Sequence, residues 1–167
     1  MSGAAARRLQ VVPQVEQQPT VAFCGHCGAR PELFSASDAQ SRVCQECQLG
    51  LLLEASADVA PAQGDPFVVI NGSLVVCALS QNAEQLLGVG ETEAVNHHIG
   101  EFLMPADVEA RGQDNLVGAI LAAAVGDGDP QTVVVRPAHE FGVRLWVKVG
   151  SCGPPRAALL VLSAARG

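Results

Sequence analysis

The chain has 167 residues, 49% hydrophobic and 16% charged, a balance typical of a globular protein with one or two domains. Its formal net charge of −7 falls within residues 54–167, and residues 1–53 are neutral. Neither part has the basic stripe that phosphate neutralisation requires, so we expect no nucleic-acid partner. No apolar run approaches the roughly 20 residues of a membrane span, and no signal-peptide core follows Arg7 and Arg8. We therefore expect a cytoplasmic protein without a membrane partner.

Residues 1–20 are rich in Ala, Gln and Pro and lack a period, so they are predicted to form a flexible tail. The stretch "CGHCGARPELFSASDAQSRVCQEC" then holds two Cys-x-x-Cys pairs separated by 16 residues: Cys24, Cys27, Cys44 and Cys47. Clustered cysteines in a cytoplasmic protein are more often metal ligands than disulfides. Their spacing matches that of structural zinc sites. The sequence therefore predicts one structural Zn²⁺ held by these four thiolates.

Residues 21–48 resemble a zinc ribbon, in which two knuckles face each other at one tetrahedral metal. Gly25 and Gly28 suit the first knuckle, where positive φ is useful. The second knuckle, "CQEC" followed by Gln48, lacks glycine, so we expect a less regular turn there. A rubredoxin-like iron centre and a zinc redox switch are the alternatives, and the scarcity of nearby aromatics disfavours iron. His26 could compete as a ligand, but four cysteines already fill the site, which leaves no position for catalysis.

Residues 49–64 are predicted to form a short amphipathic helix followed by a linker. The apolar residues near helical spacing are Leu49, Leu52, Leu53 and Val59, and Pro61 ends the pattern. The turn-rich "PAQGDP" then indicates a domain boundary. We expect this helix to transmit changes between the two modules that it connects.

After the boundary the pattern changes to short strands and helices. In "FVVINGSLVVCALS" two β-branched runs flank Asn71-Gly72, a strong signal for a hairpin because both residues tolerate positive φ. Ser80 can cap the helix of "SQNAEQLLG", which Gly88 ends. A longer helix, from about Gln113 to Val125, precedes three strand-like runs joined by short linkers. This order predicts an α+β fold, a five-stranded antiparallel sheet with helices on one face.

The stretch "LSQNAEQLLGVGETEAVNHHIGEFLMPAD" is similar to a motif of PAS sensory domains. The matching positions are Ala83, Glu84, Leu86, Leu87, Gly88, Pro105 and Asp107. Ser80 stands where the family usually has Asn, and both residues can cap a helix. The resemblance covers residues 65–167 and implies a domain that senses a small ligand or binds a partner.

A PAS domain can hold a ligand in its interior, and the candidate cleft residues here are all apolar. They are Leu86, Leu87, Ile99, Phe102, Leu103, Leu116, Ile120 and Val133. Such side chains could fill the cleft completely, which favours protein contact over a chromophore, although an unidentified small ligand stays open. Cys77 and Cys152 are interpreted as small apolar fillers. Trp146, on the polar face of its strand, could cover a dimer contact or pack against the helix before the domain.

We therefore expect a signalling or regulatory protein whose zinc ribbon acts as an interaction module, with a protein partner, a homodimer, or both. The chain contains no Gly-x-Ser-x-Gly, no phosphate-binding glycine loop and no tyrosine, so it is not expected to be an enzyme. The alternative is a transcription-associated zinc-ribbon protein that contacts nucleic acid or polymerase.

Overall fold

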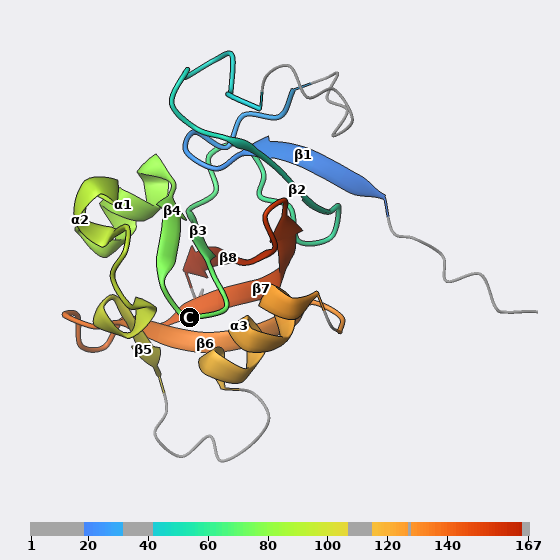
Figure 1. Cartoon of the computed structure of the whole chain (residues 1–167). Coiled ribbons are helices and arrows are strands. Elements are labelled where there is room, and N and C mark those ends of the chain that lie inside the picture. Colours follow the sequence, from blue (N-terminus) through green and yellow to red (C-terminus); the bar gives the residue numbers. More distant parts are fainter. Residues whose placement is uncertain (1–18, 32–41, 107–114, 127, 165–167) are drawn as a thin grey trace, which may run out of the picture.

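The computed structural model describes residues 19–31, 42–106, 115–126 and 128–164 (Figure 1). Most of the predicted tail and the motif residue Asp107 lie outside the described residues. The strands are β1 Thr20–Cys24, β2 Leu52–Ser56, β3 Phe67–Ile70, β4 Val76–Leu79, β5 Leu103–Pro105, β6 Gln131–Pro137, β7 Leu145–Gly153 and β8 Ala157–Ala164. The helices are α1 Gln81–Leu87, α2 Glu91–Ala94, the 3-10 turn η1 Ile99–Glu101 and α3 Leu116–Val125.

Five strands form an antiparallel sheet in the order β4-β3-β8-β7-β6, with α1, α2, η1 and α3 between its second and third strands along the chain. This topology confirms the predicted PAS-like α+β fold. The sheet is larger than expected, because β5 pairs with β6, and the hairpin of β1 and β2 joins through β2 to the end of β7 (Figure 1).

The β3–β4 hairpin forms as predicted, but its turn differs from the predicted one. Positive φ falls on Leu74, at 63°, and not on Asn71 or Gly72. The Asn71 side-chain oxygen accepts hydrogen bonds from the backbone N–H of Ser73 at 2.9 Å and of Val75 at 3.1 Å. Asn71 therefore organises a longer loop through its side chain, as Asx turns do.

The helix boundaries follow the predicted caps. Ser80 Oγ accepts from the N–H of Ala83 at 3.3 Å, and also from the N–H of Phe67 at the start of β3 at 2.9 Å. Gly88 ends α1 with φ 67°, a left-handed conformation that glycine adopts without strain. Asn115 caps α3, and the two residues predicted before it lie outside the described part. No helix among the described residues is long and apolar enough to cross a membrane.

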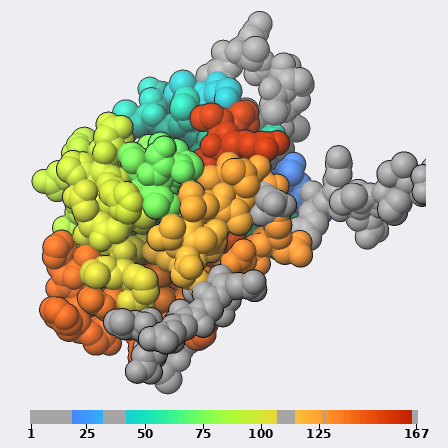
Figure 2. Space-filling view, turned by 60° about the horizontal axis from the view of Figure 1, so that its bottom comes forward, coloured from blue at the N-terminus to red at the C-terminus, as the bar shows by residue number. Residues whose placement is uncertain are grey.

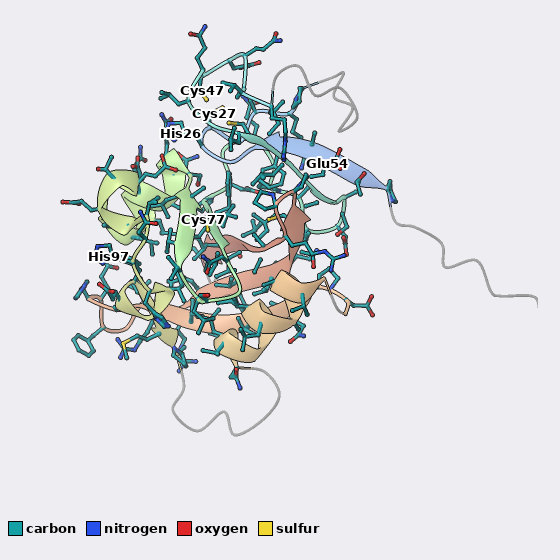
Figure 3. All side chains as sticks on the ribbon, in the orientation of Figure 1. His26, Cys27, Cys47, Glu54, Cys77 and His97 are labelled. Carbon is teal, nitrogen blue, oxygen red and sulfur yellow. The ribbon has the colours of Figure 1, made fainter. Side chains whose placement is uncertain are left out.

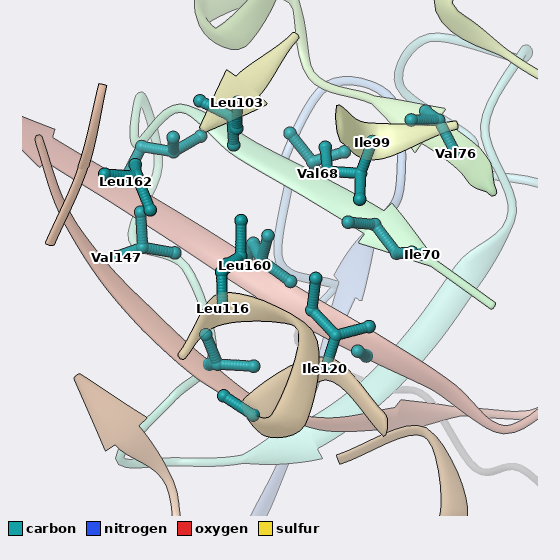
Figure 4. Close-up of a cluster of buried hydrophobic side chains, with 14 of the residues drawn as sticks. Val68, Ile70, Val76, Ile99, Leu103, Leu116, Ile120, Val147, Leu160 and Leu162 are labelled. Carbon is teal, nitrogen blue, oxygen red and sulfur yellow. The ribbon is translucent and has the colours of Figure 1, made fainter. Parts of the chain in front are cut away.

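The main hydrophobic core lies between α3, the shorter helices and the inner face of the sheet (Figure 4). Of the eight candidate cleft residues, Ile99, Leu103, Leu116, Ile120 and Val133 are buried in this core, and Leu86, Leu87 and Phe102 pack against it partly buried. The groove described below has a different lining. Aliphatic side chains thus pack together where a ligand cleft was considered.

A second apolar cluster covers part of the outer face of the same sheet. Phe23 of β1 packs edge-on against Phe67 of β3, with ring centroids 5.5 Å apart. Val59 lies over Gly150 of β7, where a Cβ would approach Val59 Cγ2 to 2.9 Å. The cysteine-containing hairpin and the following linker are therefore packed onto the sheet.

The predicted helix within residues 49–64 is wrong, because residues 52–56 form strand β2. Its leucines fit a strand equally well: Leu53 faces the outer-face cluster, and Leu52 packs beside the cysteines. Pairing with β1 and, at its end, with β7 satisfies the backbone groups that a helix would have bonded internally. Periodicity alone cannot decide whether a short apolar run forms a helix or a strand when neighbouring strands are available to pair with it.

Candidate metal centre

The four predicted ligands converge at one point beyond β1 and β2. The Sγ atoms of Cys24, Cys27, Cys44 and Cys47 all lie within 4.8 Å of one another. Those of Cys24 and Cys47 are 3.6 Å apart, and those of Cys27 and Cys44 are 3.8 Å apart. Tetrahedral sulfurs at a Zn–S distance of about 2.3 Å would be separated by about 3.8 Å. The arrangement therefore fits a single tetrahedral ion with four sulfur ligands.

The two knuckles have nearly the same backbone geometry. The N–H of Gly28 donates to the carbonyl of Cys24 at 3.0 Å, and the N–H of Gln48 donates to the carbonyl of Cys44 at 3.0 Å. Gly28 has φ 73° and Gln48 has φ 58°, so both turns need a left-handed residue at the same place. The expectation of a less regular second knuckle is wrong, because Gln48 adopts the required conformation, at a steric cost that glycine avoids.

Gly50 is the site residue that the sequence analysis missed. A Cβ at this position would lie 2.4 Å from Cys24 Sγ and 2.7 Å from His26 Cβ, so no side chain fits. Its N–H donates to Cys47 Sγ at 3.4 Å, and its carbonyl accepts from the N–H of Cys44 at 2.8 Å. The position of a glycine three residues after the last cysteine was the available signal. Gly50 brings the two knuckles close enough to share an ion.

The electrostatics of the cluster also call for a cation. Burial raises the pKa of the Cys24 thiol to about 12, so without a neighbouring positive charge this group stays protonated. Burial tends to raise the pKa of Cys47, but hydrogen bonds from the N–H groups of Gly50 and Leu49, together with those from the Cys24 and Cys27 thiols, lower it to about 6. A bound metal would stabilise all four thiolates together.

His26 does not join the cysteines and instead connects the first knuckle to the PAS-like part of the chain (Figure 3). Its Nδ1 lies 2.8 Å from Glu91 Oε2 in α2, and the ring nitrogen donates because carboxylate oxygens only accept. Glu91 Oε1 accepts from the N–H of Leu79 at the end of β4, at 3.1 Å. One carboxylate thus ties the knuckle, α2 and the sheet together.

The two arginines among the described residues of the ribbon donate hydrogen bonds to backbone carbonyls of the same chain. Arg30 donates to the carbonyls of Ala60 at 3.1 Å and of Pro61 at 2.6 Å. Arg42 donates to the carbonyl of Leu52 at 3.2 Å and also to that of Pro154. Both guanidinium groups therefore hold the ribbon against the linker and the β7–β8 turn.

The remaining cysteines and Trp146 have different environments. Cys152 is buried, which agrees with its interpretation as an apolar filler, and burial raises its pKa to about 12. Cys77 is exposed on β4, so the same interpretation is wrong for this residue. Trp146 is 46% exposed on the outer face of β7, and the helix that was one of its two alternative contacts does not form. Its role in a dimer contact stays a prediction.

No protein-family model matches the chain, and no curated protein matches its sequence. Solved structures do resemble it. The PAS domain of nitrogen regulation protein NR(II) from Vibrio parahaemolyticus is 15% identical over 61% of this chain and 90% of that one, with a TM-score of 0.44. The PAS domain of an HTR-like protein from Haloarcula marismortui is 19% identical over 60% of this chain and 81% of that one, with a TM-score of 0.43. A PAS domain from Colwellia psychrerythraea is 17% identical over 61% of this chain and 86% of that one, with a TM-score of 0.40. All three are PAS domains, and the similarity concerns the fold.

Proposed function

We propose that the chain is a regulatory interaction module in which a structural Zn²⁺ fixes a ribbon against a PAS-like domain. The observation that carries this proposal is the convergence of four sulfurs within 4.8 Å on a hairpin that pairs with the domain's own sheet. Zn²⁺ would supply four metal–sulfur bonds and, with no ligand position left open, no catalytic centre. In this proposal the chain is not an enzyme and acts through a protein partner or a second copy.

The packing of the interior supports contact with a protein more than sensing of a ligand. Three of the candidate cleft residues are at most 3% exposed and belong to one apolar core: Ile99, Ile120 and Val133. A large ligand would have to displace side chains that already fill the space at the density of a protein interior. An unidentified small ligand would therefore bind only after rearrangement of α3 or η1.

The alternative, a ribbon that contacts nucleic acid, has less support. Phosphate recognition needs arginine and lysine side chains that can reach the backbone of the nucleic acid. Arg30 and Arg42 are engaged with backbone carbonyls of the ribbon's own surroundings. Residues 1–53, which contain the ribbon, are also neutral.

Native mass spectrometry of the purified protein, compared with its denatured mass, tests the proposal. We expect one zinc per chain and no other bound mass, and we expect chelation to lower the melting temperature. A chain that carries iron, or that melts at the same temperature after chelation, would contradict the structural zinc. Additional mass that is lost on denaturation would indicate that the chain is a ligand sensor and not an interaction module. The same spectrum reports the number of subunits.

A further inference from the structure

A groove of about 840 Å³ lies between the metal knuckles and the domain. Its floor is the outer face of the sheet, with Val69, Ala78 and Ala157. One wall consists of ribbon residues from both knuckles and from β2, the other consists of α1 and α2, and the β7–β8 turn closes one end. Figure 3 shows the labelled His26 of the ribbon wall and, below it, Cys77, which also lines the groove. The groove is distinct from the apolar core, which lies on the opposite face of the sheet.

The lining is mainly apolar and continues onto exposed leucines. Leu49 is 75% exposed and Leu51 is 53% exposed, and both lie on the ribbon wall. Leu53 lies deeper in the same wall and is buried. A small molecule in the groove would leave most of Leu49 in water. A peptide that fills the groove and crosses its edge would cover Leu49 and Leu51 together, which favours a macromolecular occupant.

The opposite wall is acidic. Residues 80–94 contain Glu84, Glu91 and Glu93 and no lysine or arginine. Glu84 and Glu91 line the groove, Glu91 meeting His26 of the ribbon wall at 2.8 Å, and Glu93 is exposed on α2 beside them. Arg156 lies at the turn that closes one end, and its guanidinium donates to the carbonyl of Val125 at 2.7 Å. A partner with basic groups beside its apolar face therefore complements this wall.

By contrast, the exposed side of α3 gives no indication of a partner. Val117, Leu121 and Val125 are 44%, 42% and 59% exposed, and Figure 2 shows the helix at the molecular surface. The helix carries no charged residue, so nothing on it specifies what would cover it. It provides a control surface of similar composition to the groove.

We propose that the groove docks an amphipathic helix of a partner protein, with aliphatic side chains on the face that enters it and lysine or arginine along the side that faces α1 and α2. This inference rests on the proposed function, because both knuckles contribute to the ribbon wall. Gly25, Gly50 and Leu51 keep their places in that wall only while the cysteines are held together. Docking therefore depends on the metal, although the metal contacts no part of the partner. Helices that bind grooves in this way present anchors at i, i+3, i+4 and i+7.

Three labelled synthetic peptides of about four helical turns test this docking by fluorescence anisotropy with the zinc-loaded full chain. The first has leucines at i, i+3, i+4 and i+7 and lysines elsewhere. The second has the same composition in a scrambled order, and the third replaces the lysines with glutamates. We expect saturable binding of the first peptide, at least tenfold weaker binding of the other two, and protection of the Cys77 thiol by the first alone.

Two variants locate the binding site. Leu49→Gln is expected to weaken binding of the first peptide about tenfold, the effect of losing roughly one buried aliphatic contact. Val117→Gln, on α3, should leave binding unchanged. Leu51→Gln, compared with the wild type by circular dichroism, provides a second groove variant should Leu49→Gln disturb folding.

The results separate this inference from the proposed function. Equal binding of the scrambled peptide, or unchanged binding by both folded leucine variants, would overturn the docking site while structural zinc stands. Binding of dodecanoate in the groove, without binding of any peptide, would also overturn the docking site. That result would indicate an apolar small molecule as the occupant. A protein that contains no zinc and keeps its stability would instead refute the proposed function. Peptide binding that is lost on chelation, with the sheet still folded, would support both.

Discussion

Gly50→Ala is the substitution that tests the metal centre most directly. The new Cβ would lie 2.4 Å from Cys24 Sγ and 2.7 Å from His26 Cβ, whereas ordinary contacts begin at 3.4 Å. The two knuckles must therefore separate by about 1 Å, while metal–ligand distances tolerate only about 0.2 Å. Since the sulfur is itself a ligand, the chain cannot relieve the conflict without disturbing the metal bonds.

We expect Gly50→Ala to weaken zinc binding at least about 100-fold, which corresponds to about 2.7 kcal/mol. Competition with a chromophoric chelator of known affinity measures this change. Gly25→Ala is the matched control, because its Cβ would approach no atom closer than 3.4 Å. The control should retain affinity within about threefold, since substitutions without steric conflict change free energies by about 0.5 kcal/mol or less. Equal affinities for the two variants would refute the argument that Gly50 sets the distance between the knuckles.

Three further predictions concern the packing of the ribbon and the remaining thiols. Phe23→Ala should lower the free energy of unfolding in urea by about 3–5 kcal/mol within a single transition, and a separate early transition would show that the ribbon unfolds independently. Gly150→Ala should lower the free energy of unfolding by about 1–3 kcal/mol, because its Cβ meets Val59. Adding Val59→Ala should restore most of this stability in the double variant, and no recovery would locate the strain elsewhere. In the zinc-loaded protein a thiol reagent should modify Cys77 alone, with Cys152 reacting only on unfolding; early reaction of Cys152 would contradict its burial.

Much of the fold could be predicted because local signals agreed with the tertiary structure. Ser80 and Gly88 mark the ends of α1 in the sequence, and both perform those roles in the structure. The strands β6 and β7 alternate along most of their length, since one face packs on the core and the other is more exposed. The four cysteines were predictable for a different reason, because metal ligation requires specific residue types at limited spacing.

The strand at residues 52–56 could not be predicted from local pattern. Its assignment depends on β1 and β7, and the partner residues Cys152 and Gly153 lie about a hundred positions away in the sequence. The steric reason for a glycine at position 50 also depends on distant residues, because Cys24 and His26 approach it only after both knuckles form. Contacts of this kind are invisible to periodicity, and they are the contacts that join the ribbon to the domain.

The packing of the ribbon onto the domain changes the expected role of the metal. A separate ribbon of some 25 residues would need zinc for its own folding and would affect the domain only through a linker. Here Phe23 contacts Phe67, and Glu91 connects His26 to the N–H of Leu79, so the knuckles and the sheet share both a core cluster and a polar contact. Loss of the metal would weaken both kinds of contact and expose apolar surface on the outer face of the sheet. In the proposed function the metal site would therefore determine which surface the domain presents, even though the four cysteines lie outside the domain's main core.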